Sequence, residues 1–414
     1  MARAAVAPST RFLGALVAVT FAMNLVARGT AESFAVFLLP VQQGLGLSRP
    51  QITLTYAAYM LAYGIAAPLA GQLVDRLGAR VTYGFGLASL GSAYLMGGSA
   101  TELWHYLITV GVLAGLGGAA LGMVTASALL SRWFQSRIGF IMSVPYAAVG
   151  VGMLVLPPLT QLLLASYDWR TTHRILGVGI LVALPLVQLL PLGRFTAGSQ
   201  HWQALNAAAA ATARGPWTVT RAMRTGAFWG LFTIYLSTAL AGYSIMPHSV
   251  AYLIEQGFEP MAAAGAFGFT GMLSIIGMLA IGSISDRLGR RQTAALSYLS
   301  TIMGILSLML VSVWPSLALV YGFVVFFGLM QGVRGPIIVA MVAVLFRGGG
   351  VGAIYGTLSL AMGLGAALGS WCSALIFAWS GSYLASFALA IAAALAGLAT
   401  FWLLPSLRHD QTLG

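Results

Sequence analysis

The chain has 414 residues, of which 59% are hydrophobic and 7% are charged. Soluble domains usually carry about 25% charged residues, so this composition excludes an ordinary soluble fold and places the chain in a lipid bilayer. The formal net charge is +12, and all 20 basic residues are arginines. Cys372 is the single cysteine, which excludes an intramolecular disulfide.

Twelve hydrophobic segments follow one another along the chain. A helix needs about 20 apolar residues to cross a bilayer. The segments are 12–40, 50–74, 80–99, 103–130, 137–165, 171–192, 226–253, 258–284, 292–312, 315–346, 351–378 and 380–404. The sequence therefore predicts an all-α integral membrane protein with two pseudo-symmetric six-helix bundles, in 1–192 and 226–414, joined by a central cytoplasmic loop in 193–225.

The arginines are distributed unequally between the two sides of this topology. Only Arg49, Arg170 and Arg174 fall on one side, and most of the others fall in loops on the opposite side. Such asymmetry is the positive-inside signature, so both termini are expected in the cytoplasm and the chain in the cell inner (plasma) membrane. The positive charge reflects topology, and we expect no nucleic-acid partner.

A charged loop element occurs twice in a chain with few charges. It comprises residues 71–80, between the second and third segments, and returns 211 positions later as residues 282–291. Gly46 and Gly257 are separated by the same 211 positions. A repeat at a fixed offset of about half the chain indicates two homologous halves.

The residue types of this element suit a polar latch at the membrane surface. Gly78 permits a turn that residues with a Cβ avoid, and Gly71 permits close helix contact. Asp75 suits backbone N–H groups or a helix N-terminus, and Arg76 and Arg80 offer forked donors. The alternative is a positively charged topology anchor. The candidate gate residues are Gly71, Asp75, Arg76, Gly78 and Arg80, with Gly282, Asp286, Arg287, Gly289 and Arg290.

The pattern Gly71-x-x-x-Asp75-Arg76-x-Gly78-x-Arg80, its second copy and the twelve segments resemble the major facilitator superfamily. The resemblance implies two bundles around a central cavity that work by alternating access. It also implies that Asp75 meets the start of helix eleven at 348–350, and that Asp286 faces the start of helix five near 137–139. The first copy has Ala79 where the second has Arg290, so its latch is expected to be weaker.

A finer resemblance concerns one branch of this superfamily. Residues 28–40, 46–52 and 63–68, together with Arg132-Trp133-Phe134, resemble the monocarboxylate and oxalate–formate porters. Drug–proton antiporters of the superfamily carry a Gly-Pro-x-x-Gly-Gly element in helix five. Residues 150–158 match that element poorly, which argues against drug efflux.

Few ionisable residues fall at membrane depth, where a charge costs about 2.5–3.5 kcal/mol. Arg28 and Glu32 lie four residues apart in the first segment, so they share a helix face and can pair. One interpretation is a structural ion pair. The other is a switchable pair, in which a substrate carboxylate competes for Arg28 and frees Glu32 to take a proton.

Arg334 has no acidic residue nearby on its own helix. Its guanidinium is expected to bind an anionic substrate through both arms of the fork, or to pair with Glu32 across the cavity. His248 is a candidate proton relay or a satisfied polar residue. Gln331, Tyr146 and Tyr243 are candidate substrate-binding groups or helix–helix contacts.

No metal-spaced cluster, phosphate loop or nucleophile motif occurs in the sequence, so we expect no enzyme activity, cofactor or metal. The leading hypothesis is a secondary transporter of a small organic anion, a monocarboxylate, by proton symport or anion exchange, acting as a monomer in the lipid bilayer. Arg334 and Arg28 would bind the carboxylate, with Glu32 and His248 coupling the proton. The alternatives are an exporter of hydrophobic drugs or metabolites and a membrane sensor that binds without translocating.

Overall fold

The computed structural model describes residues 10–134, 138–199, 217–346 and 351–403, and every regular element in these ranges is a helix. The first half contains α1 (Thr10–Glu32), α2 (Phe34–Leu45), α3 (Arg49–Gly97), α4 (Leu103–Tyr106), the π-helix η1 (Leu107–Leu113), α5 (Ala114–Leu121), α6 (Met123–Ser131), α7 (Ile138–Ser166), α8 (Trp169–Gln188) and α9 (Leu192–Ala197). The second half contains α11 (Val219–Ala222), α12 (Gly226–Tyr243), α13 (Met246–Glu255), α14 (Pro260–Leu288), α15 (Arg290–Val311), α16 (Leu317–Gln331), α17 (Arg334–Leu345), α18 (Val351–Ser380) and α19 (Leu384–Leu403).

These helices account for the twelve predicted segments. Ten helical stretches among the described residues are long and apolar enough to cross a membrane. One of them, α3, has 49 residues and would be roughly 70 Å long if straight, more than twice the bilayer core. Gly78 breaks it with a non-helical backbone, which gives two spans. The apolar α16 continues through α17 as the remaining span.

The backbone repeats at the offset that the sequence predicts. Gly46 and Gly257 have φ angles of 63° and 89°, and Gly78 and Gly289 have 81° and 84°. These positive φ angles strain any residue with a Cβ, so each pair of glycines forms the same turn in both halves.

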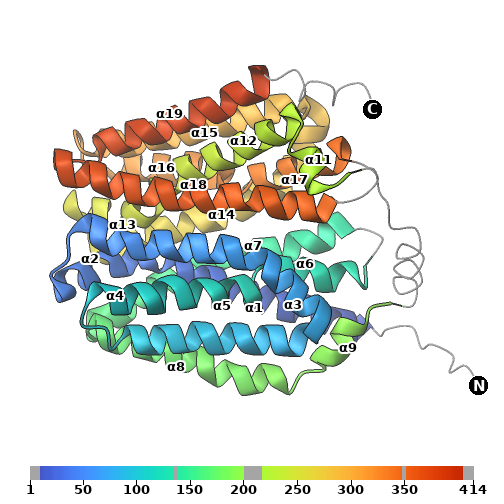
Figure 1. The fold of residues 1–414 in the computed structure, drawn as a ribbon. Coiled ribbons are helices and arrows are strands. Elements are labelled where there is room, and N and C mark those ends of the chain that lie inside the picture. Colours follow the sequence, from blue (N-terminus) through green and yellow to red (C-terminus); the bar gives the residue numbers. More distant parts are fainter. Residues whose placement is uncertain (1–9, 135–137, 200–216, 347–350, 404–414) are drawn as a thin grey trace, which may run out of the picture.

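The helices of the two halves lie in two groups, α1 to α8 and α12 to α19 (Figure 1). Across their boundary α7 packs on α14, α3 on α18, and α2 on α13. We call the end that carries α9 and α11 the inner end, after the predicted orientation, and the opposite end, where α2 and α13 finish, the outer end (Figure 1).

Glycines bring the two groups close together. A methyl group added at Gly150 of α7 would lie 2.2 Å from the carbonyl oxygen of Gly271 in α14. A methyl group added at Gly363 of α18 would lie 3.3 Å from the Cα of Gly64 in α3. Small residues permit such backbone contact in a bilayer, where lipid supplies no hydrophobic drive between helices.

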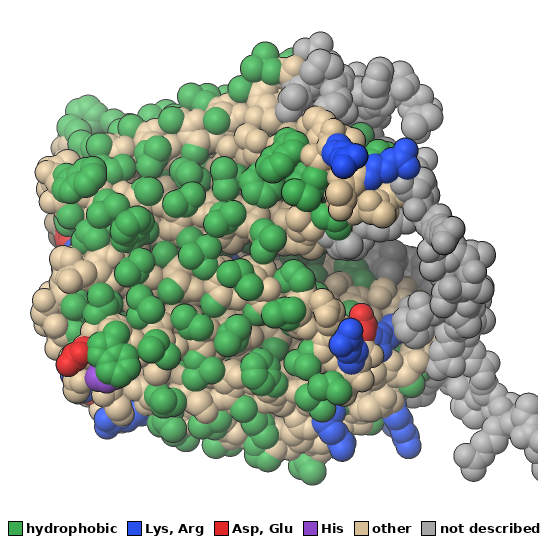
Figure 2. All heavy atoms as spheres, viewed as in Figure 1, with side chains coloured by type: hydrophobic (Ala, Val, Ile, Leu, Met, Phe, Trp, Pro, Cys, Tyr) green, Lys and Arg blue, Asp and Glu red, His purple; other side chains and the backbone are tan. Residues whose placement is uncertain are grey.

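Apolar side chains cover the flank of the molecule in Figure 2, and arginines gather near its ends. Ile65, Leu69 and Leu186 are each more than half exposed, as expected for helix faces in contact with lipid tails. Figure 2 also shows a hollow between the two groups of helices at the inner end. The site described next lies at the boundary between the two groups of helices, between the packed outer end and the hollow inner end.

Candidate functional site

Arg28 and Glu32 form a buried ion pair midway along the first span. Arg28 Nη2 lies 2.5 Å from Glu32 Oε1, and the two residues are 8% and 2% exposed. Arg28 Nη2 also donates to the Tyr243 hydroxyl at 2.8 Å, and Tyr243 belongs to α12 in the opposite half. The pair therefore lies at the boundary between the two halves.

The packing of α1 holds this pair in place. Gly29, next to Arg28, faces α7 so closely that a methyl group added at Gly152 would lie 2.9 Å from its nitrogen. One turn further on, Thr160 of α7 donates to the Ser33 hydroxyl at 3.2 Å. These contacts fix one side of α1 against α7, so Arg28 is held in contact with the other half.

Tyrosines of α3 line the same region. The Tyr56 hydroxyl lies 3.4 Å from Glu32 Oε2, and the Tyr56 and Tyr243 rings are 6.1 Å apart between centroids. Along α3, the Tyr56, Tyr59 and Tyr63 rings stack at successive centroid distances of 6.3 Å. The ion pair therefore sits beside an aromatic wall that offers hydroxyl groups and apolar ring faces.

Tyr146 lies in a second cluster that crosses between the halves. Tyr146 of α7 lies near Tyr355 of α18. The Tyr235 hydroxyl of α12 donates to Tyr355 at 3.2 Å. Tyr146 and Tyr243 were both predicted from the sequence, and each lies where the halves meet.

Arg334 lies apart from the Arg28–Glu32 pair. It begins α17, is 3% exposed and donates to the Thr301 hydroxyl of α15. Its guanidinium stacks 4.3 Å above the centre of the Tyr298 ring, and its Nε has no hydrogen-bond partner among the described residues. All these contacts lie within the second half. The pairing of Arg334 with Glu32 does not form, because Arg28 and Tyr56 hold the carboxylate.

Gln331 and His248 lie on the second half as well. Gln331 Nε2 lies 2.6 Å from the sulfur of Met246, and its Oε1 has no partner in the described part of the chain. His248 is fully buried. Its Nε2 lies 2.9 Å from the Ser370 carbonyl oxygen and therefore carries the proton, so Nδ1 accepts from the Tyr383 hydroxyl at 3.2 Å.

An ion pair between the two halves closes the outer end. Arg49 Nη2 of α3 lies 2.5 Å from Glu255 Oε1 at the end of α13. Arg49 also donates to Tyr383, the residue before α19, and its guanidinium lies 4.7 Å from the Phe377 ring centre. None of these four residues was assigned a site role from the sequence. The Ser-Arg-Pro link that begins the second span was the available signal for Arg49.

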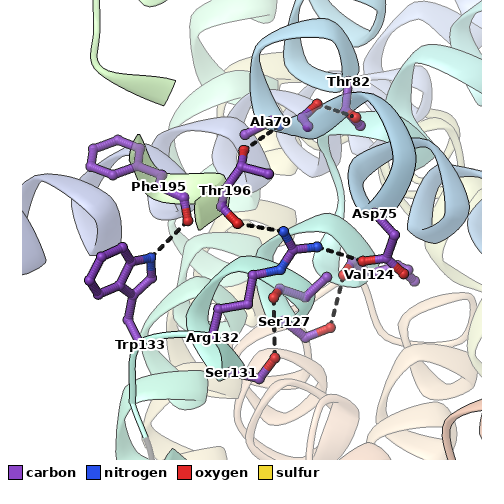
Figure 3. A network of polar contacts seen from close by, with 12 residues as sticks. Asp75, Ala79, Thr82, Val124, Ser127, Ser131, Arg132, Trp133, Phe195 and Thr196 are labelled. Atoms are coloured by element: carbon purple, nitrogen blue, oxygen red, sulfur yellow. Dashed lines mark hydrogen bonds and ion pairs between the residues drawn. The ribbon is translucent and has the colours of Figure 1, made fainter. Parts of the chain in front are cut away.

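The first copy of the charged loop element forms a polar network at the inner end (Figure 3). Asp75 accepts from Arg132 Nη2 at 2.5 Å, and Arg132 Nη1 donates to the Thr196 carbonyl at 2.7 Å. The Thr196 hydroxyl accepts from the Ala79 N–H at 2.8 Å. This network ties α3, α6 and α9 together within one half.

The remaining candidate gate residues are placed as follows. Gly71 packs against Val124 of α6, and Arg76 and Arg80 are exposed. The predicted partners of Asp75 at 348–350 lie outside the described residues, as does residue 137, and nothing is described of Gly139 beyond its place in α7. Gly282, Asp286 and Arg287 lie on α14, Gly289 makes the turn, and Arg290 begins α15; the side chains of Asp286, Arg287 and Arg290 likewise fall outside the described part.

A sequence model of the Major Facilitator Superfamily matches residues 17–336. The chain belongs to the major facilitator superfamily. Monocarboxylate transporter 13 of Rattus norvegicus is 27% identical over 392 residues, which cover 93% of this chain and 87% of that protein. The uncharacterized MFS-type transporter YcxA of Bacillus subtilis is 25% identical and covers 90% of both chains.

Solved superfamily structures share the fold. The crystal structure of a D-xylose–proton symporter aligns with a TM-score of 0.73 at 15% identity, over 97% of this chain and 99% of that one. The crystal structure of the peptide transporter POT, a point mutant in complex with sulfate, aligns with a TM-score of 0.71 at 14% identity, over 94% of each chain. This superfamily member is therefore a multi-pass membrane transporter and not an enzyme.

Proposed function

We propose that this superfamily member moves a small monocarboxylate across the cell inner membrane together with a proton. The observation that carries the proposal is the Arg28–Glu32 pair, buried midway along a span and bonded to Tyr243 of the opposite half. A guanidinium fork at membrane depth suits a carboxylate better than a neutral solute. Proton symport requires a group that changes charge with it, and Glu32 is that group.

Substrate and proton bind to the two members of the same pair, and each favours binding of the other. A carboxylate that binds Arg28 takes the place of Glu32 on the fork, and a charged Glu32 left unpaired in this environment is costly. Glu32 therefore takes a proton as the substrate binds, and the Tyr56 hydroxyl next to it remains available as a partner. When the proton leaves, Glu32 regains Arg28 and expels the anion.

Substrate binding acts on the contact between the halves. Arg28 and Tyr243 belong to different halves, so a carboxylate at Arg28 replaces or bridges a bond between them. The close contacts at Gly64–Gly363 and Gly150–Gly271 lie on the paired helices α3–α18 and α7–α14. We propose that the halves tilt about these contacts, exposing Arg28 to each side in turn.

Other predicted roles remain part of the proposal. Arg334 as a direct substrate ligand stays a prediction, and its contacts within the second half favour Arg28 as the first ligand. His248 is next to the outer closure, where its protonation would disturb Tyr383. The charged loop elements would latch the inner end, with both termini in the cytoplasm and one chain sufficient for transport.

The test uses the purified full-length chain in liposomes. Labelled pyruvate, lactate and benzoate are supplied in parallel with their uncharged amides, with and without an inward proton gradient. The proposal predicts saturable uptake of at least one acid, stimulated by the gradient, and no uptake of its amide through the protein. Equal flux of acid and amide would support the hydrophobic exporter. Saturable binding without flux would support the sensor.

A further inference from the structure

The structure points to a second carboxylate site, built on Arg49 at the outer mouth between the two halves, that captures the substrate before it reaches Arg28. This inference rests on the proposed function and adds a site to it. Arg49 is the first residue of α3 and is 6% exposed. Besides the bonds to Glu255 and Tyr383, its Nε donates to Gln42 Oε1 at 2.7 Å.

The half of the molecule to which each partner of Arg49 belongs determines which contacts remain when the outer end opens. Gln42 belongs to α2, in the same half as Arg49. Glu255, Tyr383 and Phe377 all belong to the second half. Separation of the halves at this end therefore removes the carboxylate, the hydroxyl and the ring together. Arg49 keeps a single neutral partner, and its guanidinium faces the opened mouth without a counter-charge.

The Arg49 cluster repeats the chemistry of the central pair. At the centre, the Arg28 guanidinium contacts Glu32 of its own helix and the hydroxyl of Tyr243 from the second half. At the mouth, another meets Glu255 and the hydroxyl of Tyr383 from the second half. A planar fork recognises any carboxylate in the same bidentate manner, so a group that suits one site suits the other.

The Glu255 carboxylate that pairs with Arg49 can be replaced by the carboxylate of a substrate. The Glu255 side chain is 32% exposed, whereas that of Arg49 is 6% exposed, so external solution reaches the acid first. An exposed carboxylate is weakly held, because solvent screens its ion pair. A substrate carboxylate that replaces Glu255 on the fork also removes a bond that closes the outer end.

Helix α3 connects the Arg49 site to the Arg28–Glu32 pair. Arg49 and Tyr56 are seven residues apart on α3, a rise of roughly 10 Å, and Tyr56 contacts Glu32. The other two outer arginines lie on α8, where Arg170 stacks on Trp169 and Arg174 donates to Ser99. Within the described ranges, Arg49 is therefore the outer arginine that lies where the halves meet.

The test measures transport from each side separately, with labelled pyruvate, lactate and benzoate in oriented membrane vesicles carrying the full-length protein. Arg49→Gln should raise the KM for the external acid by about tenfold or more, since a charge-assisted bond is lost. The KM measured from the inner side should change by less than about twofold. Glu255→Gln should lower the external KM, because it removes the competitor and keeps the fork.

A gate without a binding role gives a different pattern. Both variants would then loosen the same closure and shift the external KM in the same direction, which would overturn the inference. Arg174→Gln, an outer arginine on α8, serves as the matched control and should leave both KM values unchanged. If the wild-type protein transports none of the three acids, the proposed function fails. If it transports them and Glu255→Gln raises the external KM, only the Arg49 site fails.

Discussion

Replacing Glu32 by Gln should separate substrate binding from proton coupling. The amide keeps the shape of the side chain and a partner for Tyr56, and it removes the charge that competes for Arg28. Two unit charges about 4 Å apart attract by ~4 kcal/mol at an effective dielectric constant of ~20. If the substrate recovers half of this attraction, ~2 kcal/mol, its dissociation constant falls by about 30-fold.

The assay compares two modes of transport in the same liposomes. Glu32→Gln should retain exchange of labelled for unlabelled acid across the membrane, because Arg28 still binds the carboxylate. It should lose accumulation of the acid against its gradient when a proton gradient is imposed. The affinity of the variant should also become independent of pH, whereas wild-type affinity should rise as the pH falls.

One result would refute this reasoning. Proton-driven accumulation by Glu32→Gln at the wild-type rate would show that the proton does not use this carboxylate. Wild-type protein that exchanges acids but never responds to a proton gradient would instead make the carrier an anion exchanger. In that case the carboxylate role of Arg28 would stand, and the coupling role of Glu32 would fall.

Three further substitutions test the surrounding structure. Gly150→Val should abolish transport and lower the free energy of unfolding by about 1–3 kcal/mol, because its Cβ would collide with the Gly271 carbonyl oxygen. Gly179 is a helix position with open space around it, so the control Gly179→Ala should transport normally in the same uptake assay. Asp75→Asn should change the free energy of unfolding by less than about 1 kcal/mol, because the Asp75 side chain is 65% exposed. Initial-rate measurements should show slower turnover at similar KM. Unchanged turnover would contradict the proposed latch. Arg334→Gln should maintain or raise thermal stability, since it removes a buried charge that has no acidic partner among the described residues. Uptake by the folded variant then decides the role of Arg334: a raised KM for the acid makes it a substrate ligand, and an unchanged KM makes it structural.

The sequence predicted the helical framework because the bilayer imposes a simple length rule. Each of the twelve segments coincides with a helix, with part of the long helix α3, or with a run of consecutive helices. The 211-residue offset predicted turns at Gly78 and Gly289, and both have the positive φ that a glycine turn requires. The i,i+4 spacing likewise predicted the Arg28–Glu32 bond, since helix geometry alone brings those side chains together.

Contacts between distant segments were harder to predict, because helices that are apolar on every face carry little information about which face meets which neighbour. Arg334 was expected to bind an anion or to pair with Glu32; in the structure it contacts Thr301 and Tyr298 instead of Glu32, and its binding of an anion stays a prediction. The Arg49–Glu255 pair joins residues 206 positions apart. Local spacing gives no signal for such a pair.

The central claim is that a carboxylate binds at Arg28, between the two halves. The most direct measurement is equilibrium binding of the labelled acid to purified wild-type protein and to the double variant Arg28→Gln/Glu32→Gln, which removes the ion pair without leaving an unpaired buried charge. The account predicts saturable wild-type binding that excess acid displaces and the amide does not, and at least a tenfold loss of affinity in the double variant. Binding of the acid to the folded double variant with wild-type affinity would contradict it.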